Sequence, residues 1–348
     1  MKTIDKELIN KAAAILGDKS KKVAIIPHHN PDGDAIGSAM GLAQVLSNSG
    51  QNTVVIFPND YPDYYNWMEI KSDILFYNTK KNRAKNALAS SDTLICLDFN
   101  DSSRVGESLQ KRIAEFEGVK ILIDHHPDPK EFCDVILSNT LYSSTAEMVF
   151  DFVSETGLKN FLDKNAAECL YTGIMTDTGS FSHNISNPNT FNVVAELLGF
   201  GVNADEIHSK VYHNFSADRM KLLGYCLNNK MEVFPEYHSA VISISQEELK
   251  TFNFQPGDTE GFVNYPLSIG GVVFSALFIE KEDHVKASFR SKGSFAANRF
   301  SAEHYNGGGH RNAAGGEANE TLEISVRRFK QLLPAYLHQL KDAANELK

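Results

Sequence analysis

The strongest constraint on the fold is a repeating order of short apolar runs and helical segments over residues 1–190. The runs at residues 23–27, 53–57, 93–97 and 119–123 have the length and composition of buried strands. The segments between them carry apolar residues at helical spacing. Strands separated by helices form βαβ units, in which successive strands are parallel. We therefore predict an α/β fold with a parallel sheet in the first part of the chain.

Acidic and histidine side chains directly follow three of these runs. The carboxyl ends of parallel strands meet at one edge of a sheet, so residues far apart in sequence can lie together there. Asp177, in a Thr/Gly turn after a predicted helix at residues 164–175, can join them. The strand-end residues are His28, Asp32 and Asp34 after the first run, Asp98 after the third, and Asp124, His125 and His126 after the fourth.

This set of side chains has the composition of a metal site. Two carboxylates a few Å apart repel each other by roughly 4 kcal/mol at an effective dielectric of about 20, so a cation between them is favoured. Imidazole and carboxylate together suit Mn, Zn or Fe better than Ca. The donors are too many for one zinc ion and fit two metals. Each residue alone has another explanation, since Asp98 or Asp177 could cap a turn or helix and a histidine pair is often only surface.

From about residue 233 the pattern changes, and a second, smaller α/β domain with a mixed sheet is predicted. We predict that the helical residues 191–232 connect two domains, at residues 1–190 and 233–348. The expected elements of the second domain are strands at 238–244, 271–280 and 285–290, helices at 296–305 and 322–347, and a glycine-rich segment at 307–316.

The glycine-rich segment lies among basic residues. Glycines in a turn would expose backbone N–H groups in a concave arrangement that suits an anion. A flexible turn with solvated cations is the alternative, but the acidic chain concentrates cations at this place. The candidate ligands of the anion are Arg290, Ser291, Gly308, Gly309, His310 and Arg311.

The net charge, the apolar runs and the cysteine spacing limit the classes of partner that we expect this chain to bind. A formal net charge of −10 argues against a broad surface for duplex nucleic acid. The chain has no apolar run of membrane-spanning length, and its first residues lack the apolar core of a signal peptide. The cysteines are scattered, without a Cys-Xaa-Xaa-Cys pair, as expected for reduced thiols in a cytoplasmic protein. We expect neither a membrane nor duplex DNA as a partner.

The motifs taken together point to a known family. They are the run at residues 28–38, the isolated Asp98, the Asp124-His125-His126 triplet and the Thr-Asp-Thr-Gly-Ser-Phe run around Asp177. This set resembles the DHH phosphoesterase superfamily, and the segment ending in His310 resembles the DHH-associated C-terminal domain. Chain size and the Gly-Gly-Gly-His sequence resemble the nanoRNase/pAp-phosphatase (bifunctional oligoribonuclease and PAP phosphatase) group. RecJ-type exonucleases are larger, and family-II pyrophosphatases carry a different C-terminal signature.

The resemblance implies two Mn²⁺ ions per chain. The residues implied for the first ion are His28, Asp32 and the bridging Asp98. Those implied for the second are Asp34, Asp98, His125 and Asp177. His126 would contact the scissile phosphate or the leaving oxygen, and Asp124 would orient the imidazoles, so that both act with Asp98 in catalysis. Arg290 and His310 would hold a terminal phosphate or the base-proximal end of the nucleotide.

The implied activity is hydrolysis of short single-stranded oligoribonucleotides and of 3′-phosphoadenosine 5′-phosphate. A hydroxide bridging the two metals would attack the phosphorus. A cyclic-dinucleotide phosphodiesterase of the c-di-AMP type needs the same metals and one phosphate pocket, so it stays an alternative. A non-catalytic nucleotide-sensing module is disfavoured because no metal motif is eroded. We also expect that a homodimer could form.

Overall fold

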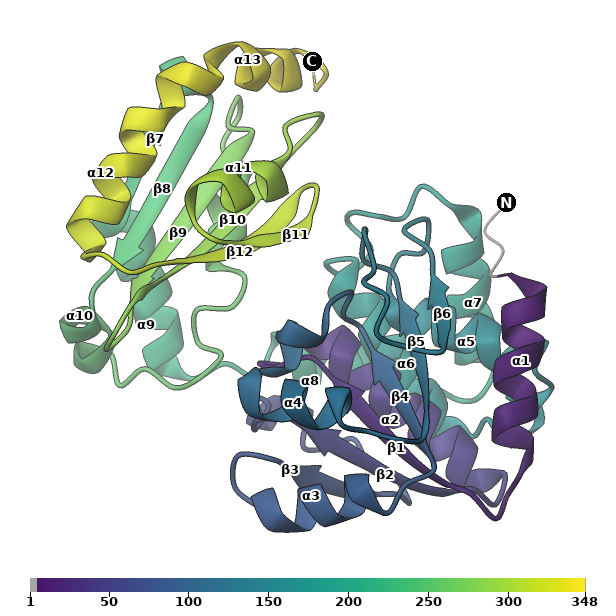
Figure 1. The fold of residues 1–348 in the computed structure, drawn as a ribbon. Coiled ribbons are helices and arrows are strands. Elements are labelled where there is room, and N and C mark those ends of the chain that lie inside the picture. The colour runs from purple at the N-terminus through teal and green to yellow at the C-terminus, as the bar shows by residue number, and fades with distance from the viewer. Residues whose placement is uncertain (1–4, 348) are drawn as a thin grey trace. The chain divides into compact units, whose positions relative to one another are not determined.

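The computed structural model describes residues 5–347, which form two compact units divided between Asn214 and Phe215 (Figure 1). The division lies within the predicted helical connector, at residues 191–232. Two of its helices, α7 (Pro188–Leu198) and α8 (Ala204–Tyr212), belong to unit 1, and α9 (Ala217–Tyr225) belongs to unit 2. Each unit has its own sheet and its own hydrophobic core.

The sheet of unit 1 is wholly parallel, as predicted, and has the strand order β3-β2-β1-β4-β5-β6. The strand order reverses at β1, so the crevice between the ends of β1 and β4 is the point where open α/β sheets bind ligands. The strands are β1 (Lys22–Pro27), β2 (Asn52–Phe57), β3 (Asp73–Phe76), β4 (Thr93–Leu97), β5 (Val119–Asp124) and β6 (Val135–Ser138).

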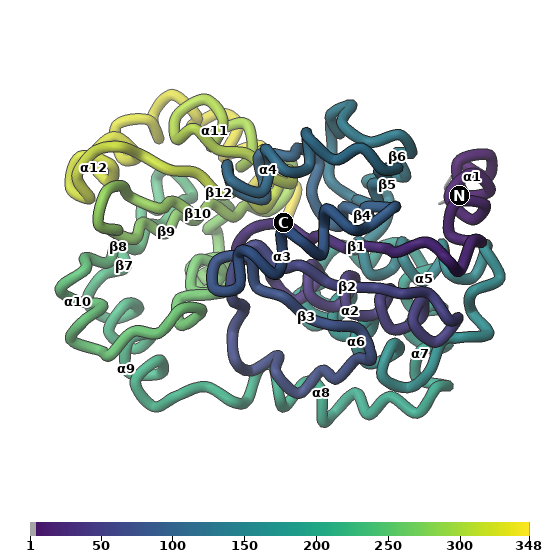
Figure 2. Tube along the Cα trace, turned by 60° about the horizontal axis from the view of Figure 1, so that its bottom comes forward, coloured from purple at the N-terminus to yellow at the C-terminus, as the bar shows by residue number. Residues whose placement is uncertain are grey.

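Helices cover both faces of this sheet, which explains why its strands are apolar on both sides (Figures 1 and 2). Val23 and Ile25 of β1 join the larger core, whereas Ala24 and Ile26 join the smaller one. The larger core is formed with α1 (Lys6–Gly17), α2 (Gly33–Asn48), α5 (Thr145–Glu155), α6 (Lys164–Asp177), α7 and α8. The smaller core is formed with α3 (Lys81–Ala89) and α4 (Glu107–Ala114).

Glycines allow α2 and α6 to pack closely. A Cβ on Gly37 would lie 2.4 Å from the carbonyl oxygen of Cys169, and one on Gly33 would lie 2.3 Å from the Thr176 hydroxyl. The Gly33 contact pairs the first turn of α2 with the last turn of α6, and the Gly37 contact continues the close approach along both helices. The packing thereby brings Asp34, near the start of α2, beside Asp177, at the end of α6.

The sheet of unit 2 is mixed, also as predicted, with the strand order β11-β12-β10-β9-β8-β7. Only the β8–β9 pairing is parallel among the described strands of this unit. The strands are β7 (Met231–Phe234), β8 (Ser239–Ile244), β9 (Phe274–Glu280), β10 (Val285–Ser291), β11 (Gly308–His310) and β12 (Ala313–Ala318). The helices are α9, α10 (Gln246–Thr251), α11 (Ala297–His304), α12 (Leu322–Leu332) and α13 (Leu337–Asn345).

Local details differ from the sequence prediction in two places in unit 2. The glycine-rich segment is not an open turn, because its residues pair as the hairpin β11–β12. The long helix predicted at 322–347 is broken into α12 and α13 by a 3₁₀ turn at Leu333–Tyr336. Pro334 in that turn has no N–H to continue the α-helical bonding. Within residues 5–347, no helix is both long and apolar enough to cross a membrane.

Substituting Gly37 by alanine tests the close packing of α2 and α6. The added methyl must displace the Cys169 carbonyl, so we expect Gly37→Ala to lower the free energy of unfolding by about 2 kcal/mol, as overpacking does. Gly17→Ala is the control, because a Cβ there meets nothing within 4 Å. Urea unfolding of both variants gives the comparison, and equal stabilities would contradict the packing argument.

Candidate metal centre and phosphate-binding surface

The turn from β1 into α2 supplies the first donors of the site. Asp32 is the N-cap of α2, and its Oδ1 accepts hydrogen bonds from the N–H groups of Asp34 and Ala35. This geometry faces its carboxylate toward His28, whose Nε2 lies 3.8 Å from Asp32 Oδ1. His28 Nε2 also lies 3.5 Å from Asp98 Oδ2, which follows β4. The two strands on either side of the switch point therefore contribute to one group.

Asp98 occupies the centre of the cluster. Its backbone is left-handed, with φ of 66°, a conformation that aspartate tolerates better than most residues. Its Oδ1 lies 3.7 Å from both His125 Nε2 and His126 Nδ1, whereas its Oδ2 is the oxygen nearer His28. Asp98 is 2 % exposed. A single buried carboxylate thus faces histidines from both neighbouring strand ends.

A second group of donors forms around His125. Its Nε2 lies 3.5 Å from Asp177 Oδ2 and 3.8 Å from Asp34 Oδ2. Its Nδ1 lies 3.3 Å from the carbonyl oxygen of Tyr142, and a proton on Nδ1 would leave Nε2 to bind a metal held by the carboxylates. Among the described residues of this unit, three donor sets have donor atoms that lie within 4.8 Å of one another. Two of them are His28, Asp32 and Asp98, and Asp34, His125 and Asp177. The third, Asp98, Asp124 and His126, shares Asp98 with the first.

Asp124 and His126 form a pair at the end of β5. Asp124 Oδ1 accepts from His126 Nδ1 at 2.7 Å, which leaves His126 Nε2 as the other reactive nitrogen. Asp124 is fully buried, and within residues 5–347 its Oδ2 has no hydrogen-bond partner. All the strand-end residues predicted from sequence as metal ligands or catalytic groups therefore lie together.

The electrostatics of the cluster fit a divalent cation. Burial, together with the charges of Asp98, Asp177 and Asp32, raises the pKa of Asp34 well above its ordinary value. Burial also raises the pKa of Asp177 to about 6. Despite burial, the pKa of His28 is raised to about 10, because Asp32 and Asp98 hold its proton. These protons balance negative charge that a metal would balance instead, so metal binding should release them.

The sequence analysis missed the contribution of α5. The N–H groups of Thr145 and Ala146 donate to Asp34 Oδ2 and Oδ1 at 2.7 and 2.9 Å. The Thr145 hydroxyl donates to Asp98 Oδ1 at 2.8 Å. The positive end of the helix dipole thus stabilises a buried carboxylate. The run of hydroxyl residues before α5 predicts a cap, but no sequence signal indicates which carboxylates its N-terminus contacts.

Glu147 holds this helix terminus in place. Its buried Oε2 accepts from the Ser143 N–H and hydroxyl at 2.9 and 2.7 Å, and from the Thr190 hydroxyl at 3.1 Å. The carboxylate therefore joins the residues just before α5 to the first turn of α7. Loss of Glu147 would remove the acceptor of the buried Ser143 N–H group, which costs stability.

In unit 2, two of the predicted phosphate ligands lie in one row across the sheet. Arg290 on β10 is opposite Ala313 on β12, and Ala313 is opposite His310 on β11. Directly opposed residues of antiparallel strands share a face, so Arg290 and His310 flank a small side chain on the same surface. Two rows further along, and therefore on the same face, Gly308 is opposite Gly315, so no side chain rises from the surface there.

The other candidate ligands have structural contacts. Ser291 follows Arg290 in the strand and so faces the core side of the sheet, where its hydroxyl donates to the Phe295 carbonyl at 2.7 Å. Arg311 donates to the Ser294 carbonyl at 2.8 Å from the hairpin loop. Gly309 has φ of 135°, and a Cβ there would lie 2.6 Å from the Ala313 carbonyl.

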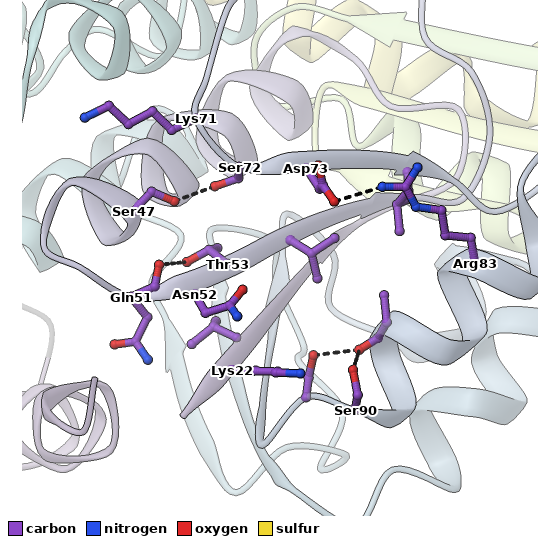
Figure 3. A pocket seen from close by; sticks show the side chains of 15 residues that line it. Lys22, Ser47, Gln51, Asn52, Thr53, Lys71, Ser72, Asp73, Arg83 and Ser90 are labelled. Atoms are coloured by element: carbon purple, nitrogen blue, oxygen red, sulfur yellow. Dashed lines mark hydrogen bonds and ion pairs between the residues drawn. The ribbon is translucent and has the colours of Figure 1, made fainter. Parts of the chain in front are cut away.

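A separate cavity of about 430 Å³ lies in unit 1, at the end of the sheet where β1, β2 and β3 begin. Figure 3 shows Arg83 turned toward Asp73, with which it forms an ion pair of 3.0 Å, and the Ser47 hydroxyl bonded to that of Ser72. None of the predicted site residues lines it. Its polar groups largely satisfy one another, so it has no part in the donor cluster.

The fold and site together define a phosphoesterase of the DHH type, with two acidic and histidine donor sets at the switch point of a parallel sheet and a mixed-sheet unit after it. Residues 22–174 match the sequence model of the DHH family, N-terminal domain, and residues 239–342 match that of the DHHA1 domain. The chain belongs to the DHH family and is a phosphate-ester hydrolase.

Similar proteins cover nearly all of the chain. A Streptococcus mutans protein, "Probable bifunctional oligoribonuclease and PAP phosphatase NrnA", is 30% identical over 86% of this chain and 91% of its own length. A Thermus thermophilus protein, "Bifunctional oligoribonuclease and PAP phosphatase NrnA", is 28% identical over 89% of this chain and 88% of its own. The crystal structure of an exopolyphosphatase-related protein from Bacteroides fragilis is 41% identical, with a TM-score of 0.92, over 98% of this chain and 99% of that one.

The raised pKa values predict that the metal-free protein loses stability as the pH rises. Unfolded aspartate titrates near pH 4, whereas Asp177 in the folded protein keeps its proton to about pH 6. Its contribution is complete below about pH 4 and is lost as the pH rises through about 6. With EDTA present, we expect a lower free energy of unfolding at about pH 8 than at about pH 5, and a flatter dependence for Asp177→Asn. Equal slopes for the two proteins in urea unfolding would contradict this.

Thr145→Val tests the support that α5 gives to Asp98. The variant keeps the branched shape and the N–H bond to Asp34 but loses the hydroxyl bond to Asp98. We expect the affinity for Mn²⁺ to fall about tenfold, as it does when a group that orients a metal ligand is removed. Isothermal titration calorimetry measures this. Thr156→Val, at the other end of the same helix, is the matched control and should bind like the wild type.

Proposed function

We propose that this protein is a Mn²⁺-dependent phosphoesterase that hydrolyses short oligoribonucleotides and 3′-phosphoadenosine 5′-phosphate. The observation that carries the proposal is the pair of donor sets that meet at Asp98. The activities named for the relatives from Streptococcus mutans and Thermus thermophilus support the choice of substrates.

In this proposal the first two donor sets each hold one divalent ion, and Asp98 is shared between them. One ion would be held by His28, Asp32 and Asp98. The other would be held by Asp34, Asp98, His125 and Asp177. When bound, such ions would activate a water as nucleophile and neutralise charge on the phosphate. The mixture of imidazole and carboxylate suits manganese.

His126, Asp124 and the first turn of α5 have further roles in the proposed reaction. Burial opposes protonation of His126, but the hydrogen bond and charge of Asp124 outweigh it and raise its pKa. His126 can thus present a proton on Nε2 to a phosphate oxygen or to the leaving oxygen, while Asp124 holds the ring through Nδ1. The amide groups at the start of α5 hold the Asp34 carboxyl group in place through two hydrogen bonds.

Unit 2 is proposed to bind the nucleotide. Arg290 and His310 share one face, and an arginine fork suits the oxygens of a phosphate. Because Ala313 and Gly308 carry no large side chain, a flat base or a sugar has room beside Arg290 and His310. Ser291, Gly309 and Arg311 are proposed to shape the hairpin that carries His310.

The charge of −10 favours small substrates over duplex DNA, whose binding needs many phosphate contacts. We further propose that the protein acts in the cytoplasm, where reduced thiols such as its four free cysteines persist. Assembly as a homodimer is part of the same proposal.

Product analysis with Mn²⁺ tests the proposed function. We expect kcat/KM for a labelled diribonucleotide and for 3′-phosphoadenosine 5′-phosphate to exceed that for a long single-stranded RNA. Asp98→Asn should abolish all turnover, because an amide cannot supply the shared negative charge, while circular dichroism shows an intact fold.

Two results would contradict the proposal. Preferred turnover of long strands would indicate a processive exonuclease, and preferred turnover of cyclic di-AMP would indicate a cyclic-dinucleotide phosphodiesterase.

A further inference from the structure

Arg104 lies in a hydrogen-bonded turn in the loop that follows β4 and the central carboxylate Asp98. The turn is a 3₁₀ helix at Ser102–Val105, capped by Asp101, whose Oδ1 accepts from the Ser103 N–H at 2.9 Å. The Arg104 N–H donates to the Asp101 carbonyl at 3.0 Å. Its backbone position is therefore set by local bonds.

A second contact ties this turn to the metal-binding loop. The N–H of His29 donates to the carbonyl oxygen of Arg104 at 2.7 Å. His29 follows the donor His28, so the backbone of Arg104 is fixed next to the loop after β1. Two loops that flank the switch point of the sheet are thus held together at Arg104.

The side chain of Arg104 is exposed at the edge of the cluster. Within residues 5–347 its guanidinium forms neither a hydrogen bond nor an ion pair with another side chain, unlike Arg83 and Arg112, which pair with Asp73 and Glu115. Its backbone carbonyl is bonded to the N–H of His29, one residue after the donor His28, so the side chain starts beside the metal-binding loop. The side chain of His126, at the end of β5, is also partly exposed, at 12%.

We propose that Arg104 contacts a non-bridging oxygen of the phosphate that is hydrolysed, as a cation supplied by the same unit as the metals. This proposal rests on the proposed function and adds a substrate contact to it. The planar guanidinium offers parallel N–H groups that match phosphate oxygens, and its charge is permanent. Arg104 would bind the phosphate in the ground state and stabilise the extra charge on its oxygens in the transition state.

Two neutral or conservative variants test this contact. For Arg104→Gln we expect kcat/KM to fall about tenfold or more both for a diribonucleotide and for bis(p-nitrophenyl) phosphate, because each presents a phosphate at the metals. Arg104→Lys keeps the positive charge but lacks the parallel N–H groups of the guanidinium, so its kcat/KM should lie between those of Arg104→Gln and the wild type. Arg83→Gln is the matched control, since Arg83 lies on α3 and pairs with Asp73.

Binding measurements separate substrate contact from structural damage. Titration calorimetry should show wild-type Mn²⁺ stoichiometry and affinity in Arg104→Gln, with binding of inorganic phosphate to the Mn²⁺-loaded protein weakened about tenfold. Unchanged phosphate binding, loss of Mn²⁺ binding, or a defect confined to substrates with a second phosphate would each overturn the assignment. If the wild type itself hydrolyses neither the dinucleotide nor the small diester, the proposed function fails instead.

Discussion

The structure depends on how it manages the repulsion between buried carboxylates. Asp34, Asp98 and Asp124 are each 2 % exposed or less, and all lie at one edge of the unit 1 sheet. Ionised carboxylates that lie close together in a protein interior repel each other by several kcal/mol unless a proton, a hydrogen-bond donor or a cation balances their charge. Three devices do so here: protons shared with histidines, the amide groups that begin α5, and a geometry that suits a divalent cation.

Close helix packing makes this concentration of charge possible. Gly37 lets α2 approach the backbone of α6, and the same approach brings Asp34 next to Asp177. A side chain at this position would separate the helices and widen the site. The metal-binding geometry is therefore encoded partly in residues that have no chemistry of their own.

Much of the site was predictable from sequence because parallel strands end at a common edge. That rule alone places Asp98 beside the residues that follow β1 and β5. The contacts of Thr145 with Asp98 were not predictable, because they depend on where a helix packs in three dimensions. Arg290 and Ser291 point to opposite faces of the sheet because side chains alternate along a strand. A predicted strand that included Ser291 would have placed Ser291 on the core side and Arg290 on the other side. The β11–β12 hairpin was missed because glycine is a poor indicator of strands.

The wide spacing of the donors along the chain has a consequence for how the protein matures. His28 and Asp177 are brought together only after β1, β4, β5 and α6 have formed and packed, so an unfolded chain offers no preformed site. Small zinc domains, in contrast, fold around their ion. Under the proposed function, the metal would bind to a unit that has already folded. Activity would then follow the supply of metal without any new synthesis of the chain.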